Sequence, residues 1–537
     1  MHTIKGVATH DSRSSCWIVI QGQVYDLTSF LDEHPGGAAV ILEYGGKHAT
    51  SVFDAIHPKG TIEQLPKEMN LGPIEGFSEA DTNTGPLPEA ATNKTLTGAI
   101  PLLSSVQNLE EFEFIAKKTL SERAWTYYSS AADGLHSHRS NLTDWTKISF
   151  RPRVLRNVSK ALLQRNVMGH ESSLPIFIAP TAHAKLGHEE GELGLARAAS
   201  RHNIVYTVSS ASSTPHVQVA KCFEEEKMSG PGLRLGKGML AFQLYLPPLN
   251  TEKVGRERIS RAKKMGYGAL VVTVDTPVLG KREEDERFRA SLDGGNIQRQ
   301  GVVAVQRTTE PGDDKDVLRG YHASSLTWDD LLWIRDAWGS GPIIINGIQS
   351  AEDALRAAQA GVQGIYLSNH GGRQLDHAPS SIATLLDINI FCPEVLGKVE
   401  VYLDGGVRRG TDVVKALCLG ATGVGIGRPF LYALGGYGTE GVVKAIQLLS
   451  DEIETTMRLV GASAISDLSP VFLNTAALER NSVLFGNSLK FINTPNNNLR
   501  LHQVPSYILP IAHIIRINPR HRRLHRHLNP TIQMPLR

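Results

Sequence analysis

The feature that most constrains the fold is a series of short apolar segments between residues 175 and 430. Eight such segments occur, and turn residues and then a helical pattern follow each of them. They read PIFIAPT, IVYTVSS, AFQLYLP, ALVVTVDTP, PIIINGI, GIYLSNHGG, EVYLDGGV and GVGIGRPF. Continuous apolar runs that alternate with helices are typical of strands buried on both faces of a parallel sheet. Eight units in ~250 residues predict an α/β fold, a TIM (β/α)8 barrel, since a doubly wound open sheet rarely needs so many.

Composition divides the chain into four parts. Residues 1–76 form a small α+β unit, and residues 77–106 contain a stretch rich in Thr, Asn, Pro and Ala that is typical of a linker. Residues 107–475 begin with a helical pattern and contain the barrel. Residues 476–537 carry nine Lys and Arg against one Glu. We expect a basic, disordered tail there, and the alternatives are a basic arm for a membrane surface or polyanion and a gene-model artefact.

The overall composition is that of an ordinary globular protein, with 41% hydrophobic and 20% charged residues. The net charge of +2 gives no global field that would favour nucleic acid. The four cysteines are scattered, so they predict neither a disulfide framework nor a zinc site and fit a reducing compartment. No apolar run approaches the ~20 residues of a membrane span, and the first residues resemble neither a secretory signal nor a mitochondrial presequence.

Two histidines at turns of the N-terminal unit predict a haem site. His34 precedes Pro-Gly-Gly, and His57 precedes Pro. Imidazole is a common axial ligand of haem iron, and the rival metal, zinc, lacks a Cys or a further His at ligand spacing. The segments CWIVIQGQVYDLTSFLDEHPGG and GGKHATSVFDAIH resemble the cytochrome b5 family. This resemblance implies a b-type haem held by His34 and His57.

Polar side chains gather where the apolar segments of the barrel end, which is where TIM barrels place their chemistry. SNHGGRQLD holds His370 and Arg373 three residues apart. Histidine is a natural proton acceptor near neutral pH, and the planar guanidinium of arginine binds a carboxylate through two hydrogen bonds. Asp275, after the fourth segment, would orient the imidazole and stabilise its cation. A base beside a carboxylate clamp predicts a site for a 2-hydroxy acid; in the alternative reading these side chains only tie loops together.

The sequences DGGVRRG and GIGRPF predict a phosphate site after strands seven and eight of the barrel. Their glycines expose backbone N–H groups, and Arg408 and Arg428 supply positive charge. A flavin mononucleotide would place its phosphate there and its ring over the mouth of the barrel. Ser209, Gln243 and Thr273 would then bond the polar edge of the ring.

From about residue 107 to 470 the chain resembles the FMN-dependent 2-hydroxy acid dehydrogenases, which include glycolate oxidase. SNHGGRQLD and DGGVRRGTDVVKALCLGA carry this resemblance. It implies His370 as the base with Asp275 as its partner, and Arg373, Arg282, Tyr127 and Tyr245 as substrate contacts. The implied FMN contacts are Pro180, Thr181, Ala182, Ser209, Gln243, Thr273, Asn346, Asp404, Gly405, Gly406, Arg408, Gly427 and Arg428.

With the haem unit in front, the chain is similar to the flavocytochrome b2 family of fungal L-lactate:cytochrome c oxidoreductases. The resemblance implies oxidation of L-lactate to pyruvate by FMN, electron transfer through haem b to cytochrome c, and a homotetramer. Alternatives are oxidation of another 2-hydroxy acid such as glycolate or mandelate, and a haem electron carrier with an impaired barrel. The resemblance points to the mitochondrial intermembrane space, but without a visible presequence the cytoplasm stays open.

One position departs from the family pattern. Members carry a Lys before a Gly at the end of the fifth strand, where it touches the flavin, whereas this chain has Asn346 in PIIINGI. A Lys ammonium favours the negative charge of the reduced flavin, and an amide offers only a neutral dipole. We predict slow flavin reduction or a lowered flavin potential; a changed substrate or a copy that is losing activity are the alternatives.

Overall fold

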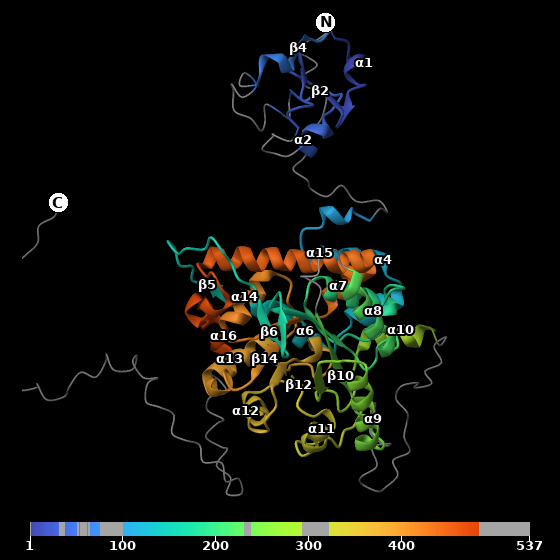
Figure 1. The fold of residues 1–537 in the computed structure, drawn as a ribbon, viewed down its shortest axis with the longest axis vertical. Coiled ribbons are helices and arrows are strands. Elements are labelled where there is room, and N and C mark those ends of the chain that lie inside the picture. Colours follow the sequence, from blue (N-terminus) through green and yellow to red (C-terminus); the bar gives the residue numbers. More distant parts are fainter. Residues whose placement is uncertain are drawn as a thin grey trace, which may run out of the picture. The chain divides into compact units, whose positions relative to one another are not determined.

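The computed structural model describes residues 2–31, 38–50, 53, 62, 65–75, 100–229, 238–292 and 322–482. The chain divides into two compact units, Met1–Ile100 and Pro101–Arg537, and each is described by itself (Figure 1). The predicted haem ligands His34 and His57 lie outside the described residues. The same holds for residues 76–99 of the predicted linker and for residues 483–537 of the predicted tail.

The first unit is built on a four-stranded antiparallel sheet. Its strands are, in spatial order, β1 (Asp11–Ser12), β2 (Ser15–Ile20), β3 (Gln23–Asp26) and β4 (Asn70–Pro73). Gln21 and Gly22 both have positive φ, and they form the two-residue turn between β2 and β3. Cys16, Ile18 and Ile20 point to a core on one face of the sheet. The described helices of this unit include α1 (Ile4–Val7), α2 (Ala38–Glu43) and the 3-10 helix η2 (Lys67–Met69).

The second unit contains a closed barrel of eight parallel strands, which confirms the predicted TIM barrel. Each strand falls on one of the eight apolar segments, and β15 pairs with β8 to close the barrel. The strands are β8 (Ile176–Ile178), β9 (Val205–Val208), β10 (Met239–Leu244), β11 (Ala269–Thr273), β12 (Ile343–Ile348), β13 (Gly364–Leu367), β14 (Glu400–Leu403) and β15 (Gly423–Ile426).

Aromatic side chains fill the interior of the barrel near the start of its strands. Phe177 meets the rings of Tyr366 and Tyr402 edge to face, at centroid distances of 5.3 and 5.7 Å. Val167 and Met168, from the hairpin β6 (Arg165–Val167) and β7 (His170–Ser172), join the same buried cluster. The barrel is therefore solid at this end, and a cavity is possible only at the other.

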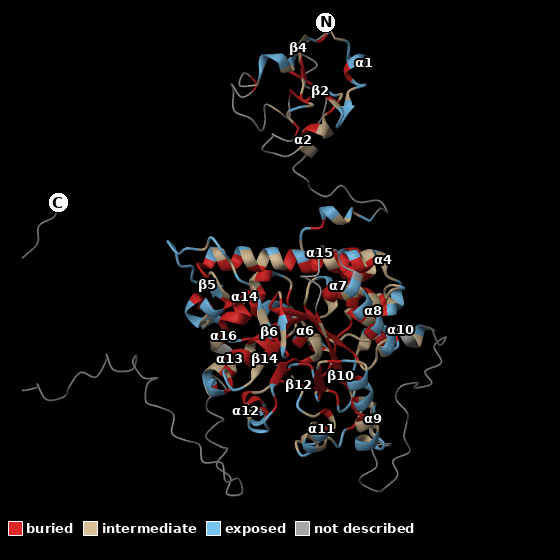
Figure 2. Ribbon diagram, in the orientation of Figure 1, coloured by how far each residue is buried: buried red, intermediate tan, exposed pale blue. Residues whose placement is uncertain are grey.

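Helices surround the barrel, and the buried residues concentrate where these helices meet the strands (Figures 1 and 2). The helices that follow strands are α7 (Glu192–Arg201), α8 (His216–Ser229), α9 (Thr251–Lys264), α11 (Asp330–Trp338), α12 (Ala351–Gln359), α13 (Ser381–Phe391), α14 (Gly410–Cys418) and α15 (Arg428–Val460). Three more precede the barrel: α4 (Leu109–Thr119), α5 (Glu122–Ser129) and α6 (His136–Thr143). The short elements are η4 (Leu103–Ser105), η5 (Asp144–Lys147), η6 (Ala184–Leu186), η8 (His370–Gly372), η9 (Pro393–Val395), η10 (Ile465–Asp467), η11 (Pro470–Phe472), β5 (Ser149–Phe150) and β16 (Leu473–Asn474).

The packed part of the second unit extends past both boundaries placed by composition. Val106 is buried at the end of the predicted linker, because it packs in the main hydrophobic core. Helix α16 (Ala476–Ser482) lies at the start of the predicted tail, and Leu478 anchors it in the same core. Composition did not predict these contacts, because a single buried apolar side chain hardly changes the mean hydropathy of a polar segment.

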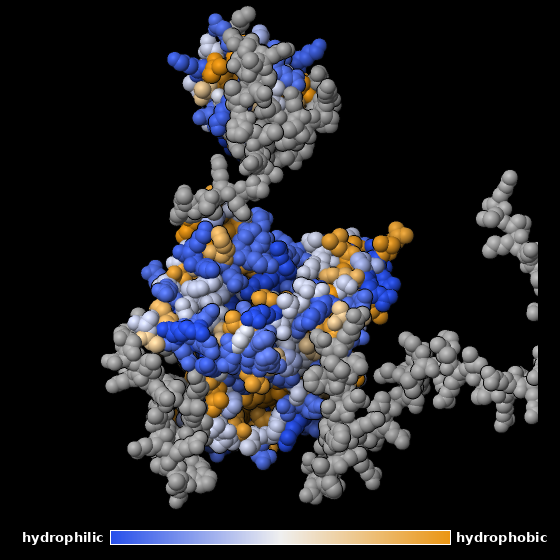
Figure 3. Space-filling view, turned by 180° about the vertical axis from the view of Figure 1, so that it is seen from behind, coloured by the Kyte–Doolittle hydropathy of each residue, from blue (hydrophilic) through white to orange (hydrophobic). Residues whose placement is uncertain are grey.

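The long polar segment after Arg282 begins with helix α10 (Glu283–Leu292). Residues 293–321 lie outside the described residues. Within the described part of the chain no helix is both long and apolar enough to span a membrane. On the face of the second unit that Figure 3 shows, hydrophobic side chains lie in small groups among hydrophilic ones.

Candidate active site

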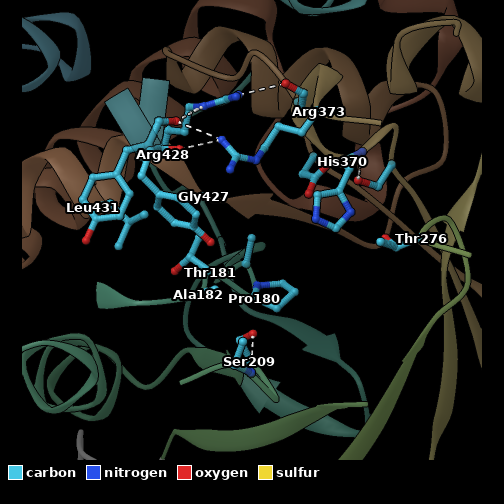
Figure 4. A pocket seen from close by; sticks show the side chains of 18 of the residues that line it. Pro180, Thr181, Ala182, Ser209, Thr276, His370, Arg373, Gly427, Arg428 and Leu431 are labelled. Atoms are coloured by element: carbon cyan, nitrogen blue, oxygen red, sulfur yellow. Dashed lines mark hydrogen bonds between the residues drawn. The ribbon is translucent and has the colours of Figure 1, made fainter. Parts of the chain in front are cut away.

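A cavity of about 780 Å³ lies at the C-terminal ends of the barrel strands. A cavity of this size is typical of cofactor and small-molecule sites. Every barrel residue that the sequence singled out lines it except Asp275, which is buried against His370. In Figure 4, Arg373 and His370 project toward the space on one side, and Pro180 and Ser209 lie on the other.

His370 and Asp275 form the acid–base pair that the sequence predicts. The Nδ1 atom of His370 lies 3.1 Å from each carboxylate oxygen of Asp275, whose side chain is 0% exposed. Because a carboxylate accepts hydrogen bonds, this contact places the imidazole proton on Nδ1 and leaves Nε2 as the basic nitrogen. Tyr245 Oη lies 3.4 Å from Nε2.

The backbone around this pair holds it closely in place. A Cβ atom at Gly347, which has φ +106°, would lie 2.5 Å from the Cβ of Asp275. Only glycine therefore allows strand β12 to approach the carboxylate. His370 itself has φ +59°, and its backbone N–H donates to Ser368 Oγ at 3.0 Å. Backbone strain of this kind is common where a side chain is aimed at a site.

Two neighbouring arginines form an anion site beside His370. Burial lowers the pKa of Arg282 and of Arg373 to about 10 each, and the charge of Arg373 contributes further to the shift at Arg282. Arg373 Nη1 donates to the carbonyl oxygens of Tyr127 and Ser130, both at 2.8 Å, which fixes the plane of its guanidinium. Two cations that are buried side by side favour an anionic ligand such as a carboxylate.

Arg428 and Arg408 lie at the predicted phosphate end of the cavity. Arg428 donates from Nε to Tyr128 O at 2.7 Å, and from Nη1 and Nη2 to Gly371 O and Ser130 O at 2.9 Å each. Arg428 thereby links the end of α5 to the loop that carries His370, and the sequence did not predict this link. Arg408 Nη2 pairs with Glu113 Oε2 at 2.9 Å. Contact of these two arginines with a phosphate stays a prediction.

The cavity meets the chemical demands of a bound flavin. Its wall contains three buried polar atoms that have no hydrogen-bond partner among the described residues: Thr181 Oγ1, Asn346 Oδ1 and Asp404 Oδ1. Buried polar groups are normally paired, so these atoms call for a ligand with polar edges. Gly406 has φ +74°, and a Cβ there would collide with the backbone oxygen of Asn141. The loop after β14 therefore needs glycine at position 406 in order to pack against helix α6.

Asn346 is 5% exposed and shares a hydrogen-bond network with the predicted flavin contacts. Its Nδ2 donates to Thr273 Oγ1 at 3.0 Å, and Gln243 Nε2 donates to the same oxygen at 2.9 Å. The hydroxyl proton of Thr273 is thus left to donate elsewhere. The carbonyl Oδ1 of Asn346 brings an acceptor, not a positive charge, to the position where the family carries a lysine.

Sequence reasoning missed His322, which lines the cavity. Its ring stacks on that of Tyr245 at a centroid distance of 4.0 Å and an angle of 9°. Burial, and then the charge of His370, lower its pKa to about 4, so the ring is neutral near pH 7. No motif surrounds His322, and it directly follows the long polar segment, so sequence pattern alone gave no signal for it. Ala211 and His183 also line the cavity.

Comparison with known proteins agrees with this geometry. Residues 116–475 match the model of the FMN-dependent dehydrogenases. The chain belongs to the FMN-dependent dehydrogenase family. Residues 3–75 match the cytochrome b5-like heme/steroid binding domain, so the two cofactors are FMN and haem. The described residues of the barrel fit the flavin, whereas the haem ligands His34 and His57 stay predictions.

Relatives of this FMN-dependent dehydrogenase include an L-lactate dehydrogenase (cytochrome), a glycolate oxidase and flavocytochrome b2. The chain is 39% identical to an L-lactate dehydrogenase (cytochrome) of Wickerhamomyces anomalus, over 89% of this chain and 80% of the relative. It is 40% identical to glycolate oxidase 3 of Arabidopsis thaliana, over 69% of this chain and 96% of the relative. A solved structure of mutant flavocytochrome b2 with pyruvate bound superposes with a TM-score of 0.62 at 34% identity, over 75% of this chain and 96% of that one.

Proposed function

We propose that this protein oxidises an L-2-hydroxy acid, L-lactate to pyruvate, on FMN and passes the electrons through a b-type haem to cytochrome c. The observation that carries the proposal is the His370–Asp275 pair next to Arg373, inside a cavity with unpaired polar atoms for a flavin. The fused haem domain distinguishes this chain from relatives such as glycolate oxidase 3. It favours a protein over oxygen as the final electron acceptor.

The two arginines bind and orient the substrate. The Nε and Nη2 atoms of Arg373 make no hydrogen bond to the described residues and are left for the substrate carboxylate, and Arg282 adds a second positive charge. A carboxylate held in a planar fork has a fixed orientation, so its C2 hydroxyl is directed toward His370.

His370 moves the proton. Nε2 accepts a proton from the substrate, and the buried carboxylate of Asp275 stabilises the imidazolium that results. Tyr245 Oη, close to Nε2, is placed to donate a hydrogen bond to the developing oxo group. Bound FMN would supply the acceptor for the two electrons and for the second hydrogen that leave the substrate. The side chain of His370 is 25% exposed, which gives the proton on Nε2 a route to solvent after the product leaves.

An anaerobic absorbance experiment on the holoprotein tests this function. Addition of L-lactate is expected to bleach the flavin band and then to produce the spectrum of reduced b-type haem. Bleaching of the flavin without haem reduction would contradict the electron path. If glycolate or mandelate bleaches the flavin band and L-lactate does not, the proposed substrate is wrong and the proposed chemistry stands.

The acceptor and the assembly are parts of the same proposal. With haem reduced, ferricytochrome c is expected to be reduced at the rate of haem oxidation. A homotetramer is expected in light scattering of the purified holoprotein. A haem that stays reduced in the presence of ferricytochrome c would show that another acceptor is used.

A further inference from the structure

A cluster of two histidines and one aspartate lies outside the catalytic cavity. His136 begins helix α6, and Asp376 and His377 follow three and four residues after Arg373. The imidazole nitrogens and a carboxylate oxygen of these three residues all lie within 4.8 Å of one another. None of the three lines the cavity at the barrel mouth, so the predicted chemistry does not use them.

The aspartate has one oxygen engaged and one aimed into the cluster. Asp376 Oδ1 accepts a hydrogen bond from the backbone N–H of Ser137 at 2.8 Å. Asp376 Oδ2 is buried and meets the distance and angle of a hydrogen bond with no donor among the described residues, and the whole residue is 8% exposed. A buried carboxylate oxygen without a partner is costly, and it is expected to bind a proton donor or a cation.

The histidines supply nitrogen ligands on the same side. The rings of His136 and His377 are exposed and stacked at a centroid distance of 4.1 Å with an angle of 24°. Because the two rings are close to parallel, their in-plane nitrogens do not yet converge on one point, and the rings must rotate to bind one ion. Both rings are exposed, so this rotation costs little. A zinc ion needs nitrogens and a carboxylate oxygen at ~2.0–2.2 Å, and water completes its tetrahedron.

We infer that His136, Asp376 and His377 form a site for a divalent transition metal ion of the Zn²⁺ class. Two imidazoles and one carboxylate are a donor set that such ions prefer over Mg²⁺ or Ca²⁺. A bound ion would link the first turn of α6 to the loop that follows Arg373. Gly134 borders the site, because a Cβ there would lie 3.2 Å from His136 Nε2 and 3.4 Å from Asp376 Oδ2.

Zinc binding to the holoprotein tests the site, by equilibrium dialysis against Zn²⁺ with metal analysis. We expect one ion per chain that is weakened on the order of 10²-fold by His136→Gln and by His377→Gln. Asp376→Asn is a useful third variant, because its Oδ1 still accepts from Ser137 while the negative charge is lost. Gly134→Ala is expected to weaken binding by crowding His136.

His188→Gln is the matched control. His188 is a half-buried histidine that faces one carboxylate, with Nδ1 3.8 Å from Glu190 Oε2, but it belongs to no three-ligand group in the described part of the chain. Zinc binding is expected to survive this change. Binding that is equally strong in His136→Gln and His377→Gln, or no binding by the unmodified holoprotein, would overturn the proposal.

Discussion

The charge of Asp275 is predicted to act through His370 and not on the substrate. Replacement by Asn keeps the side-chain size but cannot stabilise an imidazolium, so Asp275→Asn is expected to slow flavin reduction by about 10³-fold. Rapid-mixing absorbance with L-lactate measures this rate. Thr276→Val is the matched control, since it removes the 2.9 Å hydrogen bond to Asp275 Oδ1 and leaves the charge in place. Equal losses in the two variants would show that geometry, not charge, is what matters.

Asn346 is predicted to limit the rate of flavin reduction. Asn346→Lys introduces a positive charge beside the Thr273–Gln243 network, and loss of such charge stabilisation typically costs ~10²–10³-fold in rate. The variant is therefore expected to reduce its flavin on the order of 10²-fold faster and to show a higher flavin potential. Asn346→Gln, which keeps the amide, is expected to show neither change. Unaltered rate and potential in Asn346→Lys would exclude this explanation.

At the residue scale, the sequence predicted the position of a side chain in the site better when the residue follows a strand than when it follows a loop. His370 and Asp275 come directly after β13 and β11, and parallel strands of a barrel bring such residues to one end. His322 follows a long polar segment, and no periodicity fixes where such a residue lies. The pairing of Arg428 with backbone carbonyls was also missed, because a motif shows charge but not the partner of that charge.

At the scale of elements, the loop between β14 and α14 is predicted to depend on close approach as well as on positive φ. Gly406 and Gly361 have nearly equal φ values, +74° and +75°. A Cβ at Gly361 meets no atom within 4 Å, so Gly361→Ala is expected to cost only the ~1 kcal/mol of a strained backbone. A Cβ at Gly406 collides with Asn141, so Gly406→Ala is expected to cost ~3 kcal/mol or more.

The thermal midpoint and the flavin content of the two alanine variants separate these costs. Gly406→Ala is expected to lower the midpoint much more than Gly361→Ala and to lose FMN on gel filtration. Similar midpoints for the two variants would mean that helix α6, which carries Asn141, moves aside without penalty.

The elements themselves were predictable because each barrel strand is apolar on both faces. Such a run ends sharply where a turn begins, and seven of the eight strands accordingly fall inside the predicted segments, whereas β10 begins two residues before its segment, at Met239. Helix α10 was not predicted, because its charged sequence EEDERFRASL has little apolar periodicity. Its place beside the cavity, which Asp285 and Arg287 line, comes from tertiary contact and not from local pattern.

At the scale of the whole molecule, the division into two compact units predicts that the chemistry and the delivery of electrons are separable. The barrel unit has its own hydrophobic core, and the first unit has another. A chain that begins at Pro101 is therefore expected to fold, to bind FMN and to be reduced by L-lactate at the rate of the full protein. It is expected to reduce ferricyanide but not cytochrome c, because it lacks the haem domain.

A full-length variant with His34→Ala and His57→Ala is the control, since it keeps both units and removes the predicted haem ligands. Steady-state assays with the two acceptors compare the three proteins. If haem is the route, the variant and the shortened chain lose cytochrome c reduction together while ferricyanide reduction persists. Cytochrome c reduction by the shortened chain at the full rate would instead mean that the flavin serves this acceptor directly, and that the first unit has another role.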